Sequence, residues 1–134
     1  MLNNLIFHHI GYAVSDIHVT SEFYIKAGWT LSEIFIDKVQ NSQIAFLSKL
    51  NFPLMELVAP INEYSPVIKT LDKIGVTPYH ICYEIEDIEQ AVIDLKKQRF
   101  LLLFKPVPAS AFGNRKICYL YNQHTGLIEL LSIR

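Results

Sequence analysis

The sequence has no excess of charge of either sign and no long apolar segment. Its 134 residues carry a formal net charge of −1, so they offer no basic surface of the kind that binds nucleic acid. No stretch approaches the roughly 20 apolar residues that a membrane-spanning helix needs. The first residues also lack the basic segment and the long apolar run of a secretory signal. We therefore expect a cytoplasmic protein that binds neither nucleic acid nor membrane.

Cysteine is scarce, and linker-like segments are missing. Cys82 and Cys118 are the only cysteines, and both lie in apolar, strand-like runs without a partner at a useful spacing, which predicts reduced thiols in a protein core. There is no low-complexity segment and no linker long enough to separate independent domains. A chain of this length fits one compact domain, so we predict a single domain over residues 1–134.

The chain is rich in apolar residues. They make up 51% of the sequence, whereas charged residues make up 19%. This balance indicates that both faces of a sheet are largely covered, or that the protein has a subunit interface.

Two short segments of the sequence occur twice in similar form. The segment His9–Ile17 (HIGYAVSDI) returns as His80–Ile88 (HICYEIEDI), and Met55–Val58 (MELV) returns as Ile128–Leu131 (IELL) at nearly the same spacing. Halves that share a period are expected to be two copies of one supersecondary unit. Each copy begins with a His and ends with a Glu, so the pair supplies two imidazoles and two carboxylates, which are typical ligands of a metal site.

Each half predicts the element order β-α-β-β-β, which places the protein in the α+β class. In the first half the elements are expected over residues 7–14, 17–27, 30–36, 42–48 and 54–58. In the second half they are expected over residues 79–85, from 88 onward, and over 101–106, 116–121 and 127–132. We divide the chain into a first module (about 5–60), a connecting helical segment (61–77) and a second module (about 78–134).

Both module helices have an aspartate cap and an apolar side. Asp16 and Asp87 are the predicted caps. In the first helix Val19, Phe23 and Ala27 are expected on one side. In the second helix the predicted buried side consists of Ile88, Ala91, Val92 and Leu95.

Strand alternation predicts the surroundings of the four polar groups. If His9 faces a cleft, Gly11 and Ala13 of the same strand face it too. If Glu56 faces the cleft, Val58 lies on the same face of its strand. Apolar walls around a few polar groups are typical of a small-molecule site. A buried carboxylate without a counter-charge costs several kcal/mol, and a divalent cation explains why two of them occur on otherwise apolar strands.

These motifs resemble those of the vicinal oxygen chelate superfamily, which includes glyoxalases, bleomycin-resistance proteins and dioxygenases. Its members fold as two βαβββ modules that pair into a curved mixed sheet around a metal-binding cleft. Within the superfamily the chain is most similar to the methylmalonyl-CoA epimerase family, in the segments His8–Val14, Met55–Pro60, Ser65–Ile68 and Tyr79–Ile88.

The resemblance implies a metal-dependent isomerase that moves a proton next to a carbonyl group. The implied ligands of one divalent ion (Co, Ni, Mn, Fe or Zn) are His9, Glu56, His80 and Glu129. Four protein ligands leave two octahedral positions for a chelating substrate, such as an acyl-CoA. Glu129 and Glu56 are the candidate catalytic residues, because each lies on a different module and each could transfer a proton on one face. A homodimer is also implied.

Two departures from related patterns keep alternatives open. The epimerases are thought to use a further carboxylate on the strand before the second ligand, but residues 42–47 contain no acid and Gln43 is the nearest polar residue. Glyoxalase I commonly has an arginine where this chain has Ala13, and a methyl group cannot replace a guanidinium clamp. The alternatives are a lactoylglutathione lyase of the glyoxalase I type and a small-molecule-binding protein without catalytic activity.

Overall fold

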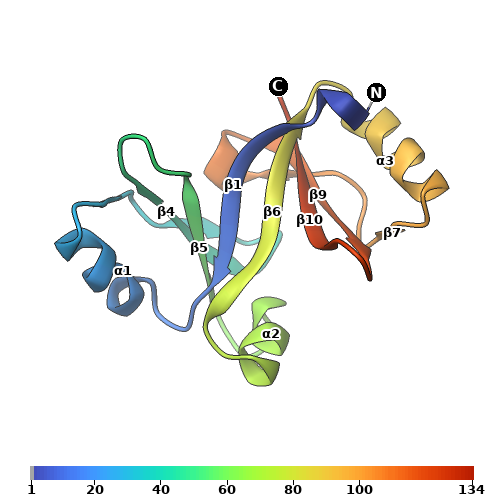
Figure 1. Ribbon diagram of the computed structural model, residues 1–134. Helices are drawn as coiled ribbons and strands as arrows, with labels where there is room; N and C mark the ends of the chain where they lie inside the picture. Colours follow the sequence, from blue (N-terminus) through green and yellow to red (C-terminus); the bar gives the residue numbers. More distant parts are fainter. Residues whose placement is uncertain (1) are drawn as a thin grey trace. The chain divides into compact units, whose positions relative to one another are not determined.

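The computed structural model describes residues 2–134, and its elements follow the predicted order in both halves (Figure 1). The chain divides into two compact units. The first unit contains residues 9–79, and the second contains residues 80–134 together with the residues that precede His9. The strand β1 (Ile6–Ala13) therefore begins in the second unit and continues in the first.

The first unit is a helix-covered sheet with mixed strand directions. Its strands follow the order β2 (Thr30–Leu31), β4 (Ser42–Ser48), β5 (Met55–Pro60) and β1, and β3 (Phe35–Asp37) pairs with β4. The strand β5 runs parallel to β1, whereas the pairs formed by β4 are antiparallel. The helix α1 (Ile17–Lys26) contacts β2, β4 and β5. The short helix α2 (Val67–Lys73) contacts β5 near the end of the unit, where a connecting helix was predicted.

The second unit repeats this arrangement. Its strands follow the order β6 (Thr77–Ile85), β10 (Gly126–Ser132), β9 (Arg115–Asn122) and β7 (Leu101–Leu102), and β8 (Val107–Ala109) pairs with β9. As in the first unit, the last strand is parallel to the first, and the intervening strand is antiparallel to the last. The helix α3 (Ile88–Lys97) contacts β7 and β10. The predicted α+β class and the internal duplication are confirmed.

One predicted strand in each half is interrupted or shortened in the structure. The predicted strand over residues 30–36 is interrupted at Ser32, whose hydroxyl accepts a hydrogen bond from the backbone N–H of Phe46 at 2.8 Å. A side chain thus takes the place of one backbone acceptor in the ladder. The predicted strand over residues 101–106 ends early, at Leu102, and Pro106 has no N–H with which to continue it. Residues 107–112 instead form β8 and the 3-10 turn η2 (Ser110–Phe112).

The aspartate caps are confirmed. The side chain of Asp16 accepts a hydrogen bond from the backbone N–H of Val19, and Asp87 accepts one from that of Gln90, both at 3.0 Å. Each bond satisfies a backbone donor that the first turn of a helix leaves without an internal partner. The caps set where the two helices begin, directly after β1 and β6.

The two helices differ in the side that they bury. In α3 the predicted side is confirmed, since Ile88, Ala91, Val92 and Leu95 are all buried. They form a core with apolar residues of β9 and β10, among them Leu120 and Leu130.

In α1 the side with Val19, Phe23 and Ala27 is the exposed one, since Val19 is 66% exposed, Phe23 is 71% exposed and Ala27 is exposed too. The packed side instead has Ile17, the small Ser21 and the partly buried Tyr24. These three positions also have helical spacing, so the sequence pattern allowed two sides and packing against Ala45 and Leu47 selected the less apolar one.

No helix in residues 2–134 is long and apolar enough to cross a membrane.

Candidate metal and active site

In the first unit, His9 of β1 lies beside Glu56 of β5. The two strands are parallel and place Gly11 opposite Glu56. Because side chains two residues apart on a strand point to the same face, His9 shares the face of Glu56. The Nε2 atom of His9 lies 3.3 Å from Oε1 of Glu56, and both side chains are almost completely buried.

In the second unit, His80 of β6 and Glu129 of β10 repeat this geometry. Here Cys82 lies opposite Glu129 in the parallel pair, again two residues after the histidine. The Nε2 atom of His80 lies 3.1 Å from Oε1 of Glu129, and the side chains are 0% and 1% exposed. The duplicated sequence therefore produces a duplicated His–Glu pair with the same strand register.

The separation within each pair suits two ligands of one ion. Ligand atoms about 2.1 Å from a metal lie about 3.0 Å apart at an octahedral right angle and about 3.4 Å apart at a tetrahedral angle. The observed 3.3 Å and 3.1 Å fall in this range. Imidazole nitrogen and carboxylate oxygen are ligands of divalent transition metals, so the residues present fit such an ion.

Each pair is accompanied by one aromatic ring that the sequence pattern did not single out. Phe46 of β4 lies directly opposite Glu56, and its ring centroid is 6.2 Å from that of His9. Tyr119 of β9 lies directly opposite Glu129, with its ring centroid 5.2 Å from that of His80. Both rings stand nearly perpendicular to the imidazoles, and both are partly exposed. Aligning the two halves by their final Glu would have paired these two positions.

Gln43 and Glu56 lie on opposite faces of the sheet. It pairs with Ala59 and alternates with Phe46, so its side chain shares the face of Ala45 and Leu47, which pack against α1. Its amide donates a hydrogen bond to the backbone oxygen of Pro60 at 3.0 Å. Gln43 therefore stabilises the end of β5 through this hydrogen bond. It does not take the role of the additional catalytic carboxylate that the epimerase pattern has on this strand.

Ala13, at the position where glyoxalase I commonly has an arginine, is completely buried. Ala13 is 0% exposed and packs with Val58 and Val67. This apolar cluster offers no counter-charge for a larger cationic side chain.

A third buried carboxylate has a structural explanation. Asp37 is 2% exposed at the end of β3. One of its oxygens accepts a hydrogen bond from the backbone N–H of Gln40 at 3.0 Å, and the other accepts one from the Gln40 side chain at 2.6 Å. Asp37 thereby closes the turn between β3 and β4.

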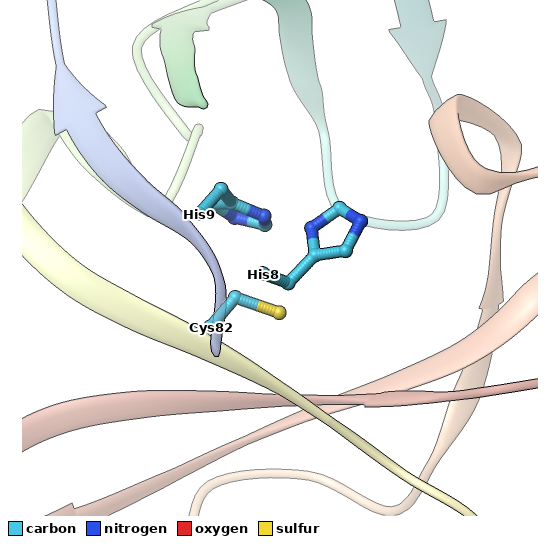
Figure 2. A group of neighbouring side chains, drawn as sticks. All are labelled: His8, His9 and Cys82. Atoms are coloured by element: carbon cyan, nitrogen blue, oxygen red, sulfur yellow. The ribbon is translucent and has the colours of Figure 1, made fainter. Parts of the chain in front are cut away.

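His8 and Cys82 are another pair of donor side chains, both in the second unit. Figure 2 shows the His8 ring and the Cys82 thiol, and their ligand atoms lie within 4.8 Å of each other. His8 also packs edge-on against Phe112, with ring centroids 5.6 Å apart. Cys82 is 0% exposed in an apolar cluster with Ile117 and Leu131. This environment agrees with the prediction that Cys82 packs in the core.

Cys118 is also a buried, protonated thiol. It is free of any disulfide and 0% exposed. Burial raises the pKa of this thiol from about 9 to about 12, with a further contribution from the negative charge of Glu129. At neutral pH Cys118 is therefore neither a thiolate ligand nor a nucleophile.

Comparisons with known proteins identify the family of this chain. A family model described as the Glyoxalase/Bleomycin resistance protein/Dioxygenase superfamily matches residues 8–119. The chain is 31% identical to the mitochondrial methylmalonyl-CoA epimerase of Homo sapiens, over 91% of this chain and 70% of that relative.

Solved structures of epimerases are also similar. Methylmalonyl-CoA epimerase from Mycobacterium tuberculosis matches with a TM-score of 0.82 at 27% identity, covering 94% of this chain and 86% of that one. A variant of the Streptomyces coelicolor methylmalonyl-CoA epimerase in complex with 2-nitronate-propionyl-CoA matches with a TM-score of 0.80 at 26% identity, covering 96% and 97%.

Proposed function

We propose that this chain, which belongs to the Glyoxalase/Bleomycin resistance protein/Dioxygenase superfamily, is a metal-dependent epimerase of an acyl-CoA. Its epimerase relatives, in sequence and in structure, support an epimerase function. One of them is bound to a propionyl-CoA derivative, which supports an acyl-CoA as the substrate class here. The single observation that carries the proposal is the duplicated, buried His–Glu pair.

The proposed metal ligands are His9, Glu56, His80 and Glu129. The support is that each unit has the same donor pair, at a separation suited to one ion, on the same strands of a repeated fold. A Co, Ni, Mn, Fe or Zn ion bound there would supply a Lewis acid that stabilises the negative charge developing on the substrate carbonyl when the neighbouring C–H bond breaks.

Glu129 and Glu56 are the proposed proton-transfer residues. Epimerisation removes a proton from one face of a carbon and returns a proton to the opposite face, so two positioned groups are needed. The two glutamates belong to different units and are both 1% exposed, so bulk water does not compete for their carboxylates. The imidazole next to each carboxylate limits its orientation.

The decisive experiment follows the α-proton of methylmalonyl-CoA in deuterated water. The protein, purified and loaded with each candidate ion in turn, is incubated with one epimer. We expect deuterium at the carbon between the two carbonyl groups, together with formation of the other epimer. Buffer alone and protein treated with EDTA are the controls for spontaneous and metal-independent exchange.

The same experiment separates the competing functions. Turnover of the glutathione hemithioacetal of methylglyoxal, without exchange in the acyl-CoA, would identify a lyase instead. Tight binding of an acyl-CoA without exchange under any metal would identify a binding protein.

A further inference from the structure

The two copies of the His–Glu pair differ at one adjacent position. Phe46 lies opposite Glu56 on the neighbouring strand, and Tyr119 lies opposite Glu129 in the equivalent register. Residues directly opposite each other on neighbouring strands point to the same face. The same face beside each glutamate therefore has an aromatic ring, and only the ring in the second unit bears a hydroxyl group.

The ring of Tyr119 is held in place. It stands edge-on to His80 at an interplanar angle of 75°, with the centroids 5.2 Å apart. Phe104 packs against it at 69°, with the centroids 5.6 Å apart. The ring is nevertheless partly exposed, whereas Glu129 and His80 beside it are buried. A ligand that reaches His80 therefore meets the Tyr119 ring next to it.

We propose that Tyr119 is a substrate-binding residue whose hydroxyl donates a hydrogen bond to a carboxylate or carbonyl oxygen of the bound acyl group. The inference rests on the proposed function, since it concerns the acyl group that the metal site would take. A phenol is a good donor to an anionic oxygen and carries no charge of its own at neutral pH. Phe46 offers no such donor, so the ring opposite Glu129 carries a hydroxyl group and the ring opposite Glu56 does not.

This asymmetry suits a substrate whose two chelating ends are chemically different. An acyl group with two chelating oxygens has one carboxylate and one thioester, which need different partners. A hydrogen bond to a charged oxygen contributes about one to two orders of magnitude to an equilibrium constant. Tyr119 would thus determine which end of the acyl group lies beside Glu129.

The test exchanges the two residues, one at a time and then together. The Tyr119→Phe variant removes one oxygen and keeps the ring, and Phe46→Tyr is the matched control in the other unit. We expect Tyr119→Phe to lower kcat/KM for methylmalonyl-CoA by about 10- to 100-fold, mainly through KM, with one ion per chain and an unchanged melting temperature. Phe46→Tyr alone should not improve KM, and the double variant should not recover the loss.

A calorimetric measurement keeps the outcome independent of turnover. The dissociation constant of methylmalonyl-CoA is compared between the wild type and Tyr119→Phe, both loaded with the ion. If the wild type shows no proton exchange, the proposed epimerase fails, but a tenfold or larger weakening of binding still supports the role of Tyr119. Equal dissociation constants and equal kcat/KM values in the two proteins would overturn it, and so would the absence of binding to either.

Discussion

Glu129 and Glu56 are the residues on which the proposed chemistry depends most. Each is a buried carboxylate with an imidazole nitrogen 3.1–3.3 Å away. Removing a carboxylate from water is costly, and the repetition of the same arrangement in two units indicates that a shared requirement maintains it. A ligand set for a cation explains the repetition, since a packing role would be served at lower cost by apolar side chains.

The first prediction concerns Glu129→Gln. We expect the rate of α-proton exchange to fall by about 10²- to 10⁴-fold, because the amide cannot accept the proton. Much of the metal should remain bound through the other three ligands, as measured by elemental analysis. Glu89→Gln is the matched control, since Glu89 is exposed and pairs with Lys116 on the surface. Exchange at the wild-type rate in Glu129→Gln would contradict its catalytic role.

The second prediction uses the raised pKa of Cys118. The folded thiol stays protonated to about pH 12, whereas in the unfolded chain it ionises above about pH 9. The stability that this group contributes is therefore complete below pH 9 and is lost as the pH rises toward 12. Between about pH 8 and pH 10.5, the free energy of unfolding should fall by about 1–2 kcal/mol more in the wild type than in Cys118→Ala. Urea titrations at the two pH values measure the free energy of unfolding. An equal decrease in the wild type and in Cys118→Ala would contradict the raised pKa of Cys118.

Among the secondary-structure elements, α1 and α3 show how much of a helix can be predicted from a local sequence pattern. In α3 the apolar spacing, the aspartate cap and the buried side all agree with the sequence. In α1 the cap was predicted correctly, but the more apolar side is exposed. Two sides of this helix have apolar residues at helical spacing, and a local pattern does not choose between them.

The third prediction compares these two helices. Leu95→Ala in α3 should lower the free energy of unfolding by about 2–5 kcal/mol, because Leu95 is buried in the core of the second unit. Val19→Ala in α1 should change it by less than about 0.5 kcal/mol, because Val19 is 66% exposed and alanine is the better helix former. Chemical unfolding of both variants measures the difference. A large loss in Val19→Ala would show that this side of α1 is covered in solution.

The fourth prediction concerns the effect of a bound metal ion on the stability of the entire folded chain. If the four proposed ligands bind one ion, a divalent metal should raise the melting temperature, because it binds the folded protein and not the unfolded chain. EDTA should reverse the shift, and elemental analysis should find one ion per chain. The His80→Asn variant should lose most of the shift, whereas His124→Asn, in an exposed turn, should keep it. A melting temperature that does not respond to any of the candidate ions would contradict the site.

The homodimer and the cytoplasmic location remain predictions, as does the single domain over residues 1–134. Sedimentation equilibrium at micromolar concentration should give the mass of two chains. A mass of one chain under these conditions would contradict the dimer.

The sequence alone was sufficient for the family, the α+β class and the order of elements in the two halves. It also singled out the two His–Glu pairs, His9 with Glu56 and His80 with Glu129, and their joint role as ligands of one ion stays a prediction. The reason is that a duplication repeats side chains, caps and strand patterns at a fixed spacing, and each of these signals can be read from neighbouring residues. The break at Ser32 and the early end of β7 at Leu102 were missed because both lie within segments whose residues are otherwise typical of strands.

The side of α1 that is buried, the face that Gln43 occupies and the residues opposite the two glutamates could not be predicted from the sequence, because the packing of the folded chain determines them. The face of Gln43 and the residues opposite the two glutamates depend on the register between paired strands, β4 with β5 and β9 with β10. Periodicity states which side chains share a face, but the face that meets a partner is selected by the packing of the whole unit. The Phe46 and Tyr119 difference, and the role proposed for it, follow from that register.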